Sequence, residues 1–209
     1  MKQEIIRKLS AAVAMSLVVG VSLAACGGGS SAFDSVSSAA GLYLRPLGRP
    51  GVPRGVAADA EDQAIAYIIR LGPELERWDY SPAWLQRVSH GHPLRFAFVY
   101  FVHRFRLSSR WQLPLMSQWA SAIETLYHDS NAFHTALHAA DTLQAAAYLA
   151  TLPAFDGIFT RDQLFCLLVA CAVHDVGHLA RTNAFLAQTG HPLAITYSDT
   201  AVLESMSLA

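Results

Sequence analysis

The apolar residues of the chain recur at spacings of three and four from Glu61 onward, and this pattern restricts the fold more than any other feature. Residues three and four apart share one face of a helix, so the pattern predicts helices rather than strands. Proline and glycine interrupt it where helices are expected to end. The stretches that carry the pattern are 64–71, 94–105, 115–126, 136–152 and 162–173. The sequence therefore predicts an all-α domain.

Two local features refine this prediction. The run FAFVYFV at 96–102 is apolar throughout, so its periodicity does not separate a buried helix from a strand. Thr160 and Gln163 have the spacing of a capping box, in which each side chain bonds the other residue's backbone N–H. A helix is therefore expected to begin directly after Thr160.

The N-terminus has the composition of a secretory leader. Three basic residues precede an uncharged apolar run at 9–25, which predicts a signal peptide over 1–25. The tetrapeptide LAAC that ends at Cys26 resembles the lipobox of bacterial lipoproteins, and this resemblance implies cleavage before Cys26 and its lipidation. Several acyl chains on one cysteine suffice for stable membrane anchoring. We expect an exported, membrane-anchored lipoprotein. An uncleaved anchor and a misassigned start codon, which would leave the protein cytoplasmic, are the alternatives.

The rest of the chain divides into a linker and one domain. Residues 26–60 are rich in glycine, serine and proline, which predicts a flexible linker. Residues 61–209 carry the helical pattern and have the length of a single domain. The whole chain of 209 residues has a net charge of −1, so charge does not suggest nucleic acid as a partner.

Two histidine pairs interrupt otherwise apolar segments. His134 and His138 are four residues apart, and so are His174 and His178, with Asp175 between the second pair. On helices this spacing would place each pair on one face. Buried polar side chains need partners, and imidazole with carboxylate suits zinc, iron, manganese or a mixed pair with magnesium. The pattern predicts a metal site, and core histidines satisfied by hydrogen bonds are the structural alternative.

Both segments also resemble a known family. HDVGHLARTN at 174–183 fits the pattern HDxxHxxxxN, and FHTALHAAD at 133–141 has an aromatic residue and a histidine ahead of HAAD. Together these motifs resemble the class I 3′,5′-cyclic-nucleotide phosphodiesterases, whose catalytic domain is a multi-helix fold of the HD-superfamily type. The likeness extends over about residues 61–204 and corresponds to roughly the first half of that domain.

The resemblance implies hydrolysis of a cyclic nucleotide, cyclic AMP or cyclic GMP, with two metal ions. His138, His174 and Asp175 would ligate the first ion, usually zinc. Asp175 would also reach the second, usually magnesium or manganese. His134 would protonate the departing 3′ oxygen, a task that suits an imidazole with a reference pKa of about 6.5.

Three further residues have supporting roles by the same resemblance. His178 and Glu204 would orient the ligands and water around the metals. Asp141 is expected to support the first helix rather than to take part in the chemistry.

The sequence also departs from the family pattern. The family continues after Glu204 with asparagine and paired histidines, whereas this chain reads SMSLA at 205–209. A fourth ligand aspartate and a purine-binding glutamine have no counterpart. We therefore expect a truncated catalytic domain that is inactive or weak when isolated. The alternatives are another HD-superfamily phosphohydrolase and a non-catalytic, metal-binding, membrane-tethered domain. Oligomeric state and the choice between cyclic AMP and cyclic GMP stay open.

Overall fold

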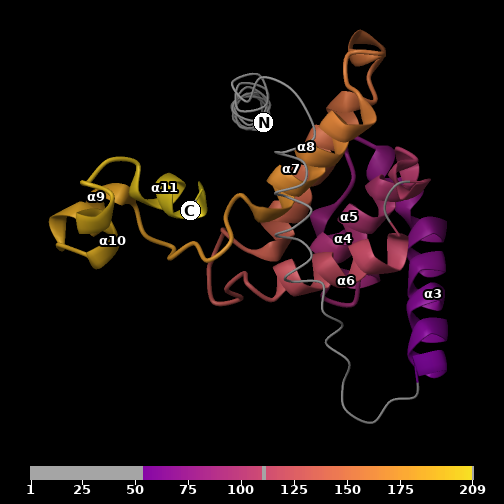
Figure 1. Cartoon of the computed structure of the whole chain (residues 1–209), viewed down its shortest axis with the longest axis horizontal. Coiled ribbons are helices and arrows are strands. Elements are labelled where there is room, and N and C mark those ends of the chain that lie inside the picture. The colour runs from indigo at the N-terminus through magenta and orange to yellow at the C-terminus, as the bar shows by residue number, and fades with distance from the viewer. Residues whose placement is uncertain (1–53, 110–111, 209) are drawn as a thin grey trace.

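The computed structural model describes residues 54–109 and 112–208, and within them it contains helices and no strand (Figure 1). The predicted all-α class is therefore confirmed. The α-helices are α3 (Arg54–Leu71), α4 (Pro82–Val88), α5 (Pro93–Arg104), α6 (Leu113–Glu124), α7 (Ala136–Ala150), α8 (Arg161–Val173), α9 (Asn183–Gln188), α10 (Pro192–Thr196) and α11 (Val202–Leu208). Short 3-10 helices are η1 (Gly72–Glu76), η2 (Leu107–Ser109) and η3 (Pro153–Phe155).

Helix α5 is the centre of the main bundle. It packs against α3, α6, α7 and α8, so the ambiguous run at 96–102 is helical and each of its residues is buried. A helix enclosed by neighbours needs no polar face, which explains why its sequence lacks the usual amphipathic pattern. Gly72 of η1 lies directly against the ring of Tyr100, where no larger side chain would fit.

A buried carboxylate fixes the start of α5. Glu124, at the end of α6, accepts a hydrogen bond from the backbone N–H of Leu94 through Oε1 (2.8 Å), and its Oε2 lies 2.9 Å from Nδ1 of His92. Burial raises the pKa of Glu124, although these hydrogen bonds work against the rise. The negative charge sits where the helix dipole is positive, so the end of α6 is held at the start of α5.

Helices α7 and α8 pack against each other; one histidine segment spans the start of α7, and the other follows the end of α8. The expected capping box begins α8. The Oγ1 atom of Thr160 accepts from the Gln163 N–H (3.2 Å), and the side chain of Gln163 accepts from the Thr160 N–H (2.9 Å). The start of α8 was therefore predictable from local sequence.

The boundary of the predicted linker differs from the structure. Helix α3 begins at Arg54, so residues 54–60 are helical although the linker was placed at 26–60. The proline and glycine residues of 45–55, which disfavour a helix, end at Gly55, and the alanine-rich residues after it favour one. The predicted signal peptide at 1–25 and Cys26 lie outside the described residues. Within the described part of the chain, no helix combines the length and apolar character that a membrane crossing requires.

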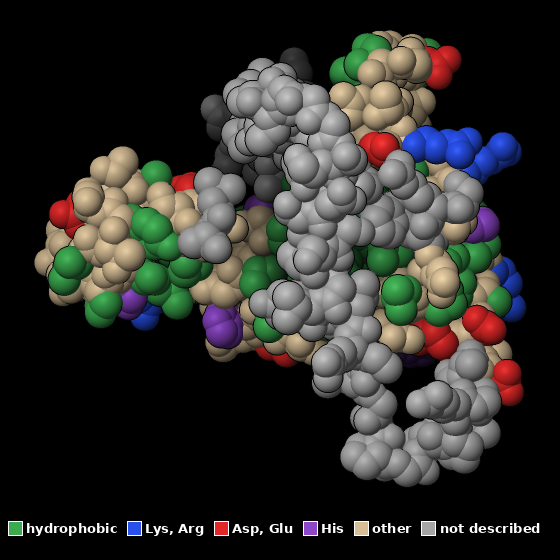
Figure 2. All heavy atoms as spheres, viewed as in Figure 1, with side chains coloured by type: hydrophobic (Ala, Val, Ile, Leu, Met, Phe, Trp, Pro, Cys, Tyr) green, Lys and Arg blue, Asp and Glu red, His purple; other side chains and the backbone are tan. Residues whose placement is uncertain are grey.

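Helices α9, α10 and α11 form a smaller group beside the main bundle (Figure 1). They have their own core of Leu186, Ala194, Val202 and Leu203. In the space-filling view, the described Lys and Arg side chains lie in small separate groups on the visible face, not in one basic patch (Figure 2).

Candidate metal centre

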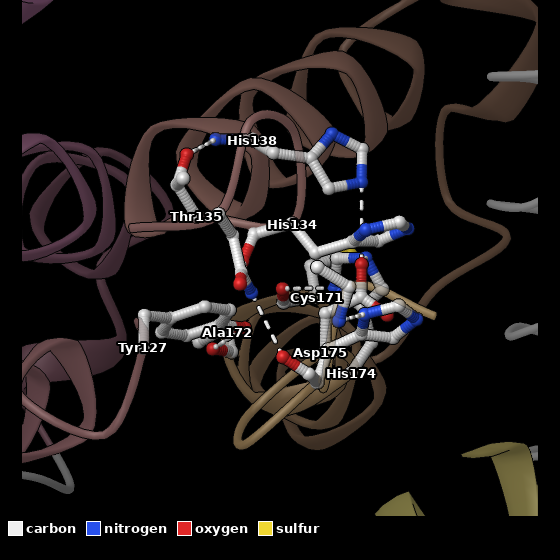
Figure 3. A network of polar contacts seen from close by, with 11 residues as sticks. Tyr127, His134, Thr135, His138, Cys171, Ala172, His174 and Asp175 are labelled. Atoms are coloured by element: carbon white, nitrogen blue, oxygen red, sulfur yellow. Dashed lines mark hydrogen bonds and ion pairs between the residues drawn. The ribbon is translucent and has the colours of Figure 1, made fainter. Parts of the chain in front are cut away.

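Three side chains from two helices converge at one point. His138 extends from the first turn of α7 toward His174 and Asp175 at the end of α8 (Figure 3). The Oδ2 atom of Asp175 lies 3.4 Å from Nε2 of His138 and 3.0 Å from Nε2 of His174. Their ligand atoms all lie within 4.8 Å of one another. Ligands that share a tetrahedral zinc ion are roughly 3.3 Å apart, because Zn–N bonds are about 2.0–2.1 Å long.

The end of α8 orients His174. This residue is the C-cap of the helix, and its Nδ1 lies 3.0 Å from the carbonyl oxygen of Cys171. A carbonyl can only accept, so Nδ1 must carry the proton and donate. In the neutral ring Nε2 is then left with a lone pair that faces His138 and Asp175. A hydrogen bond of this kind from the outer ring nitrogen is typical of histidines that ligate metals.

The electrostatics of the cluster favour a positive charge at its centre. Burial works to raise the pKa of Asp175, but hydrogen bonds with His138 and His174 outweigh it and hold that pKa well below its usual range. Burial works to lower the pKa of His174, and Asp175 more than offsets this and raises it. A carboxylate facing two imidazoles requires either imidazolium protons or a cation. The donor set therefore fits a divalent metal ion, whose binding would displace those protons.

The helix-face argument for the two histidine pairs is wrong. His134 lies before α7, whose N-cap is Thr135, and His178 lies in the turn that follows α8. Gly177 has a φ of +71° in that turn, a conformation that glycine adopts readily. Helix α7 begins after His134 and α8 ends before His178, so these two histidines meet through the loops beside the helices. The rings of His134 and His178 stack with centroids 3.6 Å apart and planes at 19°.

His134 lies beside the three convergent residues. Its ring centroid is 6.1 Å from that of His138, and the Phe133 ring packs edge-on against it at 5.2 Å. Burial lowers the pKa of His134, the nearby His178 lowers it further, and the negative charge of Asp175 opposes both. A lowered pKa makes a protonated His134 less populated at neutral pH, which works against a role as proton donor. The charge of Asp175 favours the protonated form.

The remaining predicted residues lie farther out. Asp141 accepts a hydrogen bond from the Tyr80 hydroxyl (2.8 Å), which ties α7 to the segment before α4, in keeping with the supporting role expected for it. Glu204 lies exposed on α11 and accepts from Nδ2 of Asn183 (2.8 Å), so the structure does not bring it into the group of His138, His174 and Asp175.

Sequence reasoning missed Asn131. Its side-chain amide donates to the carbonyl oxygens of His134 (3.1 Å) and His178 (2.8 Å), and so joins the two loops. The only sequence signal is a small polar residue three positions before His134, which is too common in loops to single out.

The arrangement offers two histidine nitrogens and one aspartate carboxylate that could hold a divalent ion. Residues 133–209 match the family described as 3′5′-cyclic nucleotide phosphodiesterase. Among similar proteins, the mouse (Mus musculus) "High affinity cAMP-specific and IBMX-insensitive 3′,5′-cyclic phosphodiesterase 8A" is 37% identical over 136 residues. The rat (Rattus norvegicus) "3′,5′-cyclic-AMP phosphodiesterase 4C" is 33% identical over 164 residues.

These matches cover much of the chain but little of the relatives. The mouse protein is matched over 64% of this chain and 16% of its own length. The rat protein is matched over 76% of this chain and 29% of its own length. The chain thus spans less than a third of either relative, whereas both matches reach beyond the family segment at 133–209.

Proposed function

We propose that this chain contributes to a class I phosphodiesterase catalytic domain that hydrolyses a 3′,5′-cyclic nucleotide to the 5′-monophosphate. The observation that carries the proposal is the convergence of His138, His174 and Asp175 with His134 beside them. Cyclic AMP is the first substrate to test, because the similar proteins are named for it.

His138, His174 and Asp175 would hold a divalent ion, zinc in the first position, with Asp175 also reaching magnesium or manganese in the second. Bound there, the ions would offset the negative charge of the phosphodiester and polarise it. In the reaction, a water oxygen bonds to phosphorus and the P–O3′ bond breaks. The departing 3′ oxygen takes its proton from His134, which serves as general acid. His178 and Glu204 would orient the ligands and water around the metals. His178 would do so through its stack on the His134 ring.

Metal removal tests the proposal directly. Turnover by the isolated chain is expected to be weak, and stripping the purified chain with a chelator is expected to reduce its formation of 5′-AMP from cyclic AMP to background. Zinc together with magnesium should restore it, since the negative substrate needs a cationic site. Product identity is checked by chromatography against 3′-AMP and 5′-AMP standards. Hydrolysis that survives complete metal removal would refute the proposal.

The same assay separates the two rival functions. Hydrolysis of phosphomonoesters or other nucleotides, without cyclic AMP or cyclic GMP turnover, would indicate a different HD-superfamily phosphohydrolase. Stoichiometric zinc binding without turnover of any phosphate ester would indicate a non-catalytic metal-binding domain. The presence of His134 favours catalysis over that last function, because a structural metal held by the other three residues has no need of it.

Export and anchoring form a separate part of the proposal and rest on the leader sequence alone. A protein lipidated at Cys26 is expected to incorporate radiolabelled palmitate in a bacterial host and to fractionate with membranes. Cys26→Ser should lose both properties, whereas Cys166→Ser, in α8, should keep them. Equal labelling of the Cys26→Ser variant would exclude this anchor.

A further inference from the structure

We propose that Asn131 is a positioning residue that sets the place of His134 relative to the His138, His174 and Asp175 cluster. Its effect on turnover rests on the proposed function, but its effect on the histidine rings does not. One amide group, Nδ2 of Asn131, donates to the carbonyl oxygens of His134 and His178, at 3.1 Å and 2.8 Å. The second of these bonds spans 47 positions of the chain.

The chemistry of the amide fits this bridge. A side-chain –NH₂ group has two hydrogens, and the two carbonyls use both. The backbone N–H of Asn131 donates to the carbonyl of His128 (3.1 Å), so the turn that carries the amide is itself held. An aspartate of nearly the same shape would have no hydrogen to donate, and its charged oxygens would face two carbonyl oxygens.

The bridge acts on two residues whose rings are already in contact. The rings of His134 and His178 stack at 3.6 Å, and Nδ1 of His178 accepts from the backbone N–H of Ala180 (3.0 Å). The His178 ring is therefore fixed by its own turn, while its backbone is tied through Asn131 to that of His134. The His134 ring then depends on this bridge for its distance from the metal ligands.

The ligands themselves are supported by other contacts. His174 is held by the carbonyl of Cys171, and the backbone N–H of His138 donates to Oγ1 of Thr135 (3.4 Å). Loss of the Asn131 bridge should thus displace His134 and leave the metal affinity of the cluster nearly unchanged. This combination separates positioning of His134 from general destabilisation of the site.

The test compares Asn131→Asp and Asn131→Ala with Ser130→Ala, a control at the adjacent exposed residue. Proton NMR of the imidazole rings, at a pH well above the ordinary imidazole pKa, reports the stack through ring-current shifts. We expect both Asn131 variants to lose the shifts of His134 and His178, with Asn131→Asp affected more. Zinc affinity by calorimetry should stay within about twofold of the parent. The kcat for cyclic AMP should fall by roughly 10- to 100-fold, the size of effect that a 1 Å misplacement can have.

Each other outcome is decisive. Unchanged ring shifts in a folded Asn131→Asp protein would overturn the proposal, and so would zinc affinity that falls as far as kcat. If the isolated parent shows no turnover of cyclic AMP, kcat offers no comparison, and the NMR and zinc measurements still decide whether Asn131 sets the stack. If Asn131→Asp does not fold, Asn131→Ala, which removes both donors, takes its place. Ring shifts in that variant equal to those of the parent would then overturn the proposal.

Discussion

Replacing Asp175 by asparagine is expected to abolish metal binding and, with it, hydrolysis of cyclic AMP. Asp175 supplies the only carboxylate among the three convergent side chains, and its Oδ2 faces both imidazoles. Asparagine has nearly the same size but no charge, so the cluster loses the group that attracts a cation. Loss of an outer-shell partner typically costs 10- to 100-fold in metal affinity, so loss of a ligand should cost more than about 100-fold.

Calorimetric titration with zinc measures this directly, and thermal unfolding gives a second reading. Zinc should raise the melting temperature of the parent, because a ligand that binds only the folded state stabilises it. The Asp175→Asn variant should show no such rise. Asp156→Asn removes the same charge from an exposed position after η3 and should behave like the parent. Zinc affinity retained in Asp175→Asn would show that the three side chains do not form the metal site.

Local sequence predicted the helices well where each helix has its own signals. The capping residues of α8 fixed its start, and the spacing of apolar residues located α5, α6 and α7 to within a few residues. The state of 96–102 was not predictable locally, because its burial comes from the helices that enclose α5. The predicted linker extended past the start of α3, because the helix-forming alanines after Gly55 outweigh the proline and glycine residues before it.

The candidate site was only partly predictable, for a different reason. The motifs named residues that the structure does bring together, but His134 and His178 reach the site through loops rather than along helix faces. Their positions depend on the turn at Gly177 and on the hydrogen bonds that Asn131 donates, of which the one to His178 spans 47 positions. Gly177, for example, donates its backbone N–H to the carbonyl of Leu126 (3.3 Å). Such contacts leave no periodic pattern that a single sequence could show.

Glu204 shows that a role assigned by family resemblance does not always match the contacts in the structure. Its carboxylate bonds Asn183, and the carbonyl oxygen of that same Asn183 side chain accepts from the backbone N–H of Leu203 (2.9 Å). In this structure the pair joins α9 to α11 within the smaller helical group. The contribution of Glu204 to the surroundings of the metals therefore stays a prediction, whereas its contact with Asn183 is direct.

The His134→Ala variant is expected to lose roughly 10²- to 10⁴-fold in kcat for cyclic AMP while it keeps its zinc affinity. That range is typical for removal of a general acid, and His134 is not among the three convergent ligand residues. The loss should depend on the leaving group. The 3′ oxygen of a nucleoside is a poor leaving group without a proton, whereas p-nitrophenolate needs none.

Bis(p-nitrophenyl) phosphate therefore provides the decisive comparison. Its hydrolysis by His134→Ala should fall far less than that of cyclic AMP, because the proton proposed to come from His134 is needed for only one of the two substrates. His128→Ala, at an exposed histidine of the same loop, should leave both rates near those of the parent. Equal losses for both substrates would mean that His134 positions the phosphate rather than protonating the leaving oxygen. Its stacking on His178 would then be the contact through which it acts.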